Sequence, residues 1–230
     1  RWIPARRAEV SRKEVSVHVL IDNAGLLLAA FGTTLKLLVI AGLLSLAWGT
    51  VLAAMRVGPV RVLNLAGTLY VTLFRNTPLL VILLLIFFGL PKVGITWGYF
   101  WPNVIALTLY TSSFVCEALR SGVNSIPLGQ AEASRSLGMT FGQSMREVIL
   151  PQAFRAVVPP LASVLIALTK NTSLVAIFGL PDLTARMKDL LTDHASELLW
   201  IFFGIALAYV LIVEIISLIA ALIERRWRVA

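Results

Sequence analysis

The sequence predicts an all-α protein that crosses a membrane several times. Of its 230 residues, 58% are hydrophobic and only 14% are charged, and its mean hydropathy is +0.87. A soluble domain has roughly a quarter of its residues charged. The apolar residues lie in long continuous runs rather than in alternating segments of about ten, which favours helices over a membrane barrel. At roughly 20 apolar residues per crossing, the chain has room for about five or six transmembrane helices.

Five apolar segments account for these predicted helices, and they give a transmembrane domain over residues 25–224. Their approximate bounds are 25–55, 62–90, 93–116, 156–180 and 198–223. The second segment contains Arg75 followed by Pro78. Proline removes a backbone donor, so this helix is expected to kink or break there.

The basic residues predict how the chain is oriented. Nine of them lie in three regions that five crossings place on one side of the membrane: Arg56, Arg61, Arg120, Arg135, Arg146, Arg155, Arg225, Arg226 and Arg228. The net charge of +8 is therefore interpreted as topology rather than as nucleic-acid binding. We expect the 120–155 loop and the C-terminal tail, 225–230, to be cytoplasmic.

The basic N-terminal tail, residues 1–24, disagrees with this orientation. It carries Arg1, Arg6, Arg7, Arg12 and Lys13, yet five crossings place it outside. Either a helix precedes Arg1, or the tail lies on the membrane surface, or the orientation is reversed. We favour the first two, because the long loop and the C-terminus agree with each other.

The long 120–155 loop is patterned as two short helices. Ser125 and Pro127 are expected to open the first, which runs to about Leu137 and stops at Gly138. Thr140 is expected to cap the second, from about Phe141 to Leu150, with Pro151 following. Mixed small, apolar and charged faces suit docking to a soluble protein.

The same loop contains a spaced motif: Glu132, Ala133 and Ser134 are followed by Gly138 after three residues and then by Val148-x-Leu150-Pro151 after nine more. This motif resembles the EAA loop of bacterial ABC importer permeases. Ser134 and Val148 depart mildly from the pattern. Three further segments are similar to polar amino-acid permeases: Phe74–Leu80 (FRNTPLL), Glu117–Gly122 (EALRSG) and Leu168–Leu174 (LTKNTSL). The resemblance covers about Leu26 to Arg226, and glutamate-type permeases are the most similar.

This resemblance implies an ATP-driven importer of the bacterial inner or plasma membrane with type I architecture. Two permease subunits, the same chain or a paralogue, would form the path by alternating access. ATPase subunits would bind ATP and Mg2+, and an extracellular or periplasmic binding protein would deliver the amino acid. The chain has no phosphate-binding loop motif, so we expect no cofactor, no catalytic residue and no metal site in it. The residues expected to couple to the ATPase are Pro127, Gln130, Ala131, Glu132, Ala133, Ser134, Leu137 and Gly138.

Polar residues inside the predicted helices are candidates for substrate binding. They are Lys170, Asn171, Thr172, Ser173, Arg75, Asn76 and Thr77. Lysine can bind a carboxylate and the neutral residues can donate hydrogen bonds, although such residues also tie helices together. Asn171, where the family segment also admits Asp, favours a neutral or anionic substrate such as glutamine or glutamate. Glu117 is expected to pair with Arg75, Arg120 or a partner subunit.

Two other functions remain open on the sequence alone. An autonomous ion-coupled carrier or channel would need no ATPase, and the patterned loop argues against it. A membrane enzyme would need acids, histidines or a nucleophile gathered at one depth. Glu117, Lys170 and Arg75 form no recognisable catalytic set, so this is the least favoured alternative.

Overall fold

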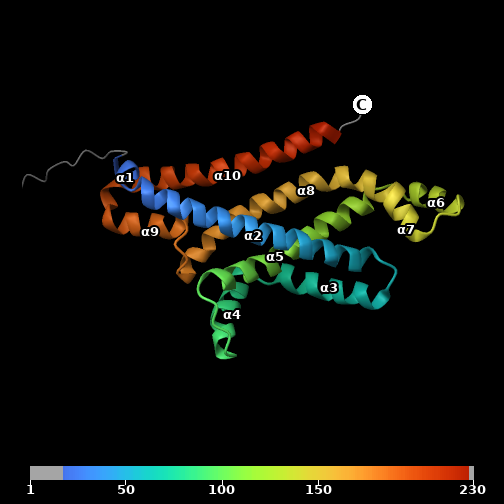
Figure 1. Ribbon diagram of the computed structural model, residues 1–230, viewed down its shortest axis with the longest axis horizontal. Helices are drawn as coiled ribbons and strands as arrows, with labels where there is room; N and C mark the ends of the chain where they lie inside the picture. The colour runs from blue at the N-terminus through green and yellow to red at the C-terminus, as the bar shows by residue number, and fades with distance from the viewer. Residues whose placement is uncertain (1–17, 228–230) are drawn as a thin grey trace, which may run out of the picture.

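The computed structural model describes residues 18–227, and every regular element in that range is a helix (Figure 1). The prediction of an all-α protein is therefore confirmed. The predictions for residues 1–17 and 228–230, which include Arg1, Arg6, Arg7, Arg12, Lys13 and Arg228, lie outside the described residues. In chain order the elements are α1 (His18–Asp22), α2 (Ala24–Val57), α3 (Arg61–Asn76), α4 (Leu79–Lys92), α5 (Phe100–Asn124), α6 (Leu128–Ser136), α7 (Phe141–Gln143), η1 (Ser144–Ile149), α8 (Leu150–Asn171), η2 (Thr172–Phe178), α9 (Leu183–Asp193), η3 (Ala195–Glu197) and α10 (Leu198–Trp227).

Four long helices, α2, α5, α8 and α10, run along the long axis of the molecule (Figure 1). Helix α5 packs against both α2 and α8. The main core joins these three helices through fully buried leucines: Leu37 of α2, Leu107 of α5 and Leu168 of α8. Helix α5 is therefore the central element of the bundle.

Three described helical segments are long and apolar enough to cross a membrane by length and composition: 24–57, 141–178 and 195–226. A fourth crossing follows if α3 and α4 count as one bent span. Helix α5, which falls on our third predicted crossing, is not among them. Its buried positions include Asn103, Thr111, Ser112 and Ser113, which other helices cover. Polar residues lower the apolarity of α5, so the prediction of five crossings is not confirmed.

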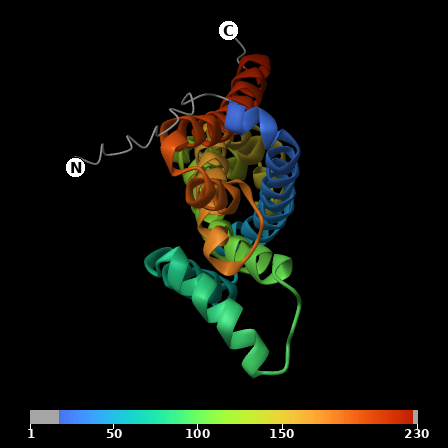
Figure 2. The ribbon, with the colours of Figure 1, turned by 90° about the vertical axis from the view of Figure 1, so that its left-hand side faces the viewer.

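The predicted break at Pro78 is present. Helix α3 ends at Asn76 and α4 begins at Leu79, at an angle of 101° to α3. Helix α4 leaves the bundle and projects away from its long axis (Figure 2). One side of α4 is anchored in the core by Leu79 and Leu83, whereas Leu85 on another side is 66% exposed. The second apolar segment is thus two short helices rather than one long one.

The 120–155 loop forms a hairpin that differs from the prediction in two places. Gly138 terminates α6 with a φ of +80°, and Thr140 caps α7 through a capping box with Gln143, as expected. Ser125 does not cap α6: its hydroxyl donates to the carbonyl of Gly122, at the end of α5. The second helix is not a separate element ending before Pro151. It continues through the π-helix η1 into α8, because proline is tolerated in the first turn of a helix.

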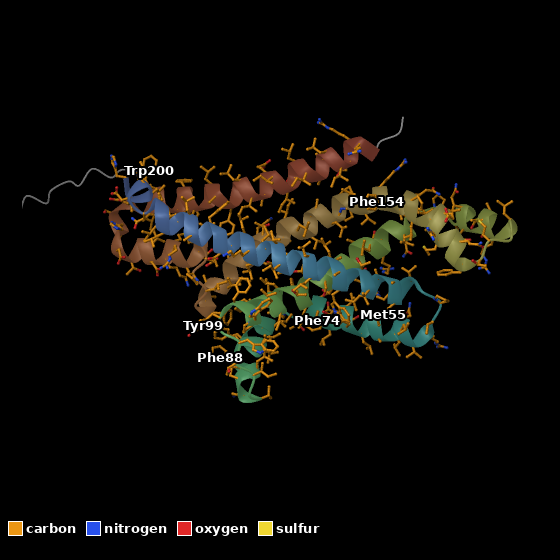
Figure 3. All side chains as sticks on the ribbon, in the orientation of Figure 1. Met55, Phe74, Phe88, Tyr99, Phe154 and Trp200 are labelled. Carbon is orange, nitrogen blue, oxygen red and sulfur yellow. The ribbon has the colours of Figure 1, made fainter. Side chains whose placement is uncertain are left out.

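Three of the regions that we predicted to share one side of the membrane lie toward one end of the bundle. The hairpin α6–α7, the α2–α3 connection and the C-terminal end of α10 lie toward one end, and α1 and α9 lie at the other (Figure 1). Labelled side chains show the two ends: Trp200 lies near α1, whereas Met55 and Phe154 lie toward the hairpin (Figure 3). The described basic regions that we predicted to share one side, around Arg56, Arg61 and Arg225, therefore do share one end.

Candidate functional site

A pocket between α5 and α8 brings one of the predicted polar residues, Asn171, into a defined site. Its volume is about 330 Å3. The pocket is lined by Tyr110, Thr111, Phe114, Ser163, Val164, Ala167, Leu168 and Asn171. Its size falls within the range of small-molecule sites, which are roughly 300–1,000 Å3. We call it the α5–α8 pocket.

The polar groups of the α5–α8 pocket are not all satisfied within the protein. Thr111 is 3% exposed, and its hydroxyl has no hydrogen-bond partner among the described residues. The Ser163 hydroxyl donates to the carbonyl of Pro159 at 3.2 Å. Leaving a buried hydroxyl without a partner costs about 1–3 kcal/mol, so such a group needs an explanation. Thr111 is thus a lining residue whose hydroxyl is enclosed and has no hydrogen-bond partner among the described residues.

The four consecutive residues 170–173 do not converge on this pocket. Lys170 is exposed and does not line it, whereas Asn171 does. Thr172 is fully buried and donates to the carbonyl of Thr169 at 2.7 Å. The Ser173 hydroxyl donates to the carbonyl of Lys170 at 2.7 Å. Successive helical residues point in different directions, so only one of the four reaches the pocket.

The second predicted group, residues 75–77, behaves similarly. The Arg75 guanidinium lies over the ring of Phe114, with its Cζ atom 5.4 Å from the ring centroid. Because Phe114 lines the α5–α8 pocket, Arg75 lies next to it. Asn76 is exposed, and the Thr77 hydroxyl donates to the carbonyl of Leu73 at 2.8 Å. Of these three residues, only Arg75 is close to the site.

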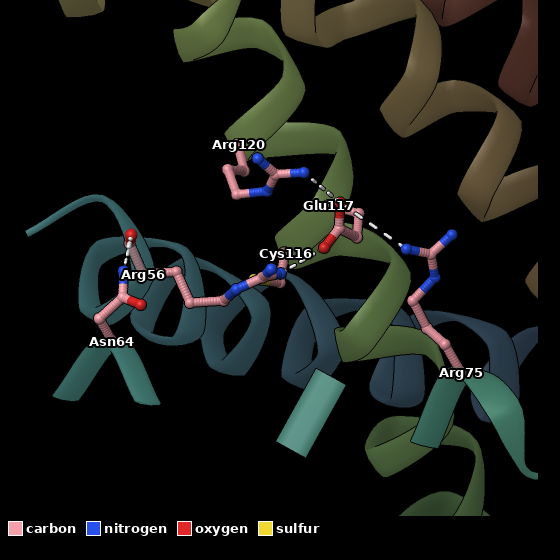
Figure 4. Close-up of polar contacts among 6 residues, drawn as sticks. All are labelled: Arg56, Asn64, Arg75, Cys116, Glu117 and Arg120. Carbon is pink, nitrogen blue, oxygen red and sulfur yellow. Dashed lines mark hydrogen bonds and ion pairs between the residues drawn. The ribbon is translucent and has the colours of Figure 1, made fainter. Parts of the chain in front are cut away.

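Arg75 also belongs to a cluster of three arginines around one carboxylate (Figure 4). Glu117 forms ion pairs with Arg56, with Arg120 at 2.9 Å and with Arg75 at 3.7 Å. The predicted pairing of Glu117 with Arg75 and Arg120 is thus confirmed. Arg56 was missed as a partner, because its place at the end of an apolar run was interpreted only as a sign of topology. We call these four residues the Glu117 cluster.

The Glu117 cluster joins the C-terminal ends of α2 and α3 to α5. Arg56 lies in the last turn of α2, Arg75 in the last turn of α3, and Glu117 in α5. The Arg56 guanidinium also donates to the Cys116 sulfur at 3.8 Å, and the Arg56 carbonyl accepts a hydrogen bond from the Asn64 side chain. A single carboxylate therefore ties α2 and α3 to the central helix.

A second polar cluster, at the opposite end, was not predicted. Asp182 is fully buried and caps α9 by accepting a hydrogen bond from the Ala185 backbone at 2.9 Å. Its other oxygen accepts from the Tyr209 hydroxyl at 3.3 Å. Burial raises the pKa of the Asp182 carboxyl above its ordinary value, against the lowering effect of the Ala185 hydrogen bond. Asp182 therefore fixes the start of α9 against α10.

The predicted coupling residues lie on the α6 hairpin and are mostly exposed. Gln130, Glu132 and Leu137 face outward, and Leu137 is 83% exposed. Ser134 is the exception, because it is buried and its hydroxyl donates to that of Ser144 at 2.8 Å. Ser134 thus holds α6 against η1, while its neighbours form a surface. Pro127, Ala133 and Gly138 are also exposed, and Ala131 is half-buried.

Comparisons with known proteins agree on one family. The family described as "Binding-protein-dependent transport system inner membrane component" matches residues 45–229. GluC, a glutamate transport system permease protein of Corynebacterium glutamicum, is 40% identical over 198 residues, which are 81% of this chain and 87% of GluC. GltJ, a glutamate/aspartate import permease protein of Escherichia coli, is 35% identical over 217 residues, which are 89% of this chain and 88% of GltJ.

The fold has also been solved in a similar protein. A chain of an amino acid ABC transporter, crystallised with histidines, is 32% identical and superimposes with a TM-score of 0.84. The match covers 92% of this chain and 98% of that chain.

Proposed function

We propose that the chain carries glutamate or glutamine across the membrane, driven by a separate ATPase. It belongs to the family of binding-protein-dependent transport system inner membrane components. Membership makes it a multi-pass membrane permease subunit of an amino-acid ABC transporter. The observation that carries the finer proposal is the α5–α8 pocket, which is lined by Thr111, Asn171 and Phe114, with the Arg75 guanidinium over the Phe114 ring.

The chemistry of the pocket favours a substrate that is neutral or anionic. None of the described residues that line the pocket is Asp or Glu, and the Arg75 guanidinium lies over the lining residue Phe114. The Thr111 hydroxyl and the Asn171 carboxamide offer hydrogen bonds to a polar side chain. Two relatives named for glutamate support the same choice. Lys170, Asn76 and Thr77 stay predictions, because their side chains do not line this pocket.

The direction of transport and its energy source are part of the proposal. The chain imports the amino acid by alternating access, and ATP and Mg2+ bind to a separate ATPase. A second permease subunit, the same chain or a paralogue, completes the path, and an extracellular or periplasmic binding protein delivers the substrate. The basic end of the bundle is cytoplasmic, together with the C-terminus, because positive charge is retained on that side.

The α6 hairpin is the proposed contact with the ATPase. It lies at the basic end, at the tip of the bundle (Figure 1), and it exposes Leu128 at 79% and Leu137 at 83%. Apolar side chains this exposed on a cytoplasmic hairpin indicate a protein contact. Since η1 continues into α8, a movement of the hairpin is passed to the helix that carries Asn171.

Copurification tests this assignment. In mild detergent, the affinity-tagged chain should bring an ATPase with it, and Glu132→Lys should weaken that association. Gly138→Ala should do the same, because the left-handed backbone at Gly138 disfavours a side chain by about 1–2 kcal/mol. Gly142→Ala is the matched control: an added Cβ meets nothing within 4 Å, and the φ of Gly142 is not positive.

The outcomes separate the alternatives. Loss of the ATPase with Gly138→Ala, but not with Gly142→Ala, would support docking through α6. Equal copurification by all variants would contradict it. Amino-acid transport by the purified chain alone would instead support an autonomous carrier.

A further inference from the structure

We propose that Arg75 is shared between Glu117 and the substrate, so that it leaves Glu117 to bind the α-carboxylate of an amino acid in the α5–α8 pocket. This inference rests on the proposed function, since it needs an amino acid in that pocket. It adds the group of the substrate that is recognised and the residue that recognises it.

The charges of the Glu117 cluster do not balance within it. Three guanidinium groups form their described ion pairs with one carboxylate, which leaves an excess of two positive charges. An excess of positive charge attracts an anion, and arginine binds carboxylates through two parallel hydrogen bonds. The cluster therefore favours the arrival of an additional carboxylate.

The three arginines are not equally committed to Glu117. Arg56 is 13% exposed, hydrogen-bonds the carboxylate and also contacts Cys116. Arg120 hydrogen-bonds the Oε2 atom of Glu117 at 2.9 Å. Arg75 lies 3.7 Å from that same oxygen, beyond hydrogen-bond distance, and is 42% exposed. Of the three arginines, Arg75 therefore gives up the weakest interaction with Glu117 when its side chain moves.

Arg75 also lies next to the α5–α8 pocket. Its guanidinium rests on the face of Phe114, at 5.4 Å from the centroid, and Phe114 lines the α5–α8 pocket. Arg75 stands one residue before the end of α3, where the chain turns by 101° into α4. Figure 4 shows its side chain approaching Glu117 from a different direction than Arg56 does. The proposed movement is a change of the Arg75 side-chain rotamer, which turns the guanidinium from Glu117 toward the pocket.

The pocket supplies the remaining contacts that such a ligand needs. Thr111 lines the pocket together with Asn171, and its buried hydroxyl has no hydrogen-bond partner among the described residues. With Arg75 on the α-carboxylate, these neutral groups are left for the rest of the amino acid. The transfer of Arg75 also changes the charge balance around Glu117, which ties α2 to α5 near the start of the α6 hairpin.

A comparison of each amino acid with its own α-amide tests the proposal. The permease, assembled with its ATPase in lipid nanodiscs, is titrated with L-glutamate or L-glutamine and with the corresponding α-amide. The wild type should bind the acid about 10- to 100-fold more tightly than the amide, as expected for a charge-assisted pair. Arg75→Gln should bring the two dissociation constants within about twofold of each other.

Arg120→Gln is the matched control, since it removes one guanidinium from the same carboxylate without contact to a lining residue. It should keep the wild-type preference for the acid. Phe114→Leu, which removes the ring under the Arg75 guanidinium, should reduce the preference and serves as a second variant if Arg75→Gln does not fold.

The results distinguish two failures. If the wild type prefers the acid and both Arg75→Gln and Phe114→Leu keep that preference, the role of Arg75 is refuted and the pocket still binds the amino acid. If the wild-type complex binds neither compound, the proposed pocket itself is refuted, and the role of Arg75 with it.

Discussion

Helices α5 and α10 run along the same axis but differ in what surrounds them. Helix α10 is strongly apolar, and only 11% of its most apolar stretch of 18 residues is buried within the protein. Helix α5 has twelve buried residues of 25, and serine, threonine and asparagine are among them. In this pair, the more apolar helix is the one that the described residues cover least. The helix that holds the pocket and the Glu117 cluster is the less apolar one.

The largest expected effect comes from the same substitution in both helices. Leu107→Ala in α5 removes a fully buried side chain and should lower the free energy of unfolding by about 2–5 kcal/mol. Leu207→Ala in α10, which is 59% exposed, should cost less than about 0.5 kcal/mol. Thermal unfolding in detergent measures both. Equal losses would mean that α10 is as enclosed as α5 in the assembled protein, and the comparison would not hold.

Acidic residues give the second contrast. Glu117→Gln in α5 leaves three guanidinium groups without their shared counter-charge and should cost about 2–3 kcal/mol, discounted for partial exposure. Glu214→Gln in α10 should be nearly neutral, since Glu214 is exposed and takes part in no described ion pair. Unfolding measured over a range of salt concentrations provides the check. Added salt should weaken the repulsion in Glu117→Gln and leave Glu214→Gln unchanged. A large effect of Glu214→Gln would place a partner's cation beside α10.

The smallest effect separates two threonines of α5 from each other. Thr108 and Thr111 both carry hydroxyls without a described partner, but only Thr111 lines the α5–α8 pocket. Replacing either by valine should not lower stability and should recover part of the cost of about 1–3 kcal/mol of a buried hydroxyl without a partner, because no described hydrogen bond is lost. Thr111→Val should weaken amino-acid binding about three- to tenfold, as expected for one hydrogen bond, whereas Thr108→Val should not. Binding isotherms for the two variants decide this, and equal affinities would remove Thr111 from the site.

Much of the fold followed from the sequence because it depends on local chemistry. Pro78 breaks the second segment, Gly138 ends α6, and Thr140 caps α7, each through properties of one residue and its near neighbours. The continuation of α7 through η1 into α8 was not predicted, because Pro151 is equally compatible with the end of one helix and the start of another.

The candidate site was less predictable because it depends on which way side chains point. Lys170 and Asn171 are adjacent in sequence, yet one is exposed and the other lines the pocket. Arg56 and Glu117 are 61 residues apart, and only the packing of α2 on α5 brings them together. Thr111 carries no signal in the sequence, since its significance lies in a hydroxyl that the fold leaves unpartnered.

The single cysteine of the chain gives the Glu117 cluster a built-in reporter. Cys116 is fully buried, and its sulfur lies against the Arg56 guanidinium. A thiol shielded in this way reacts only when its surroundings open. The rate at which a membrane-permeant alkylating reagent labels the native protein therefore times the opening of this helix junction. No residue has to be engineered, and mass spectrometry can follow the labelling of Cys116 with and without ATP or amino acid.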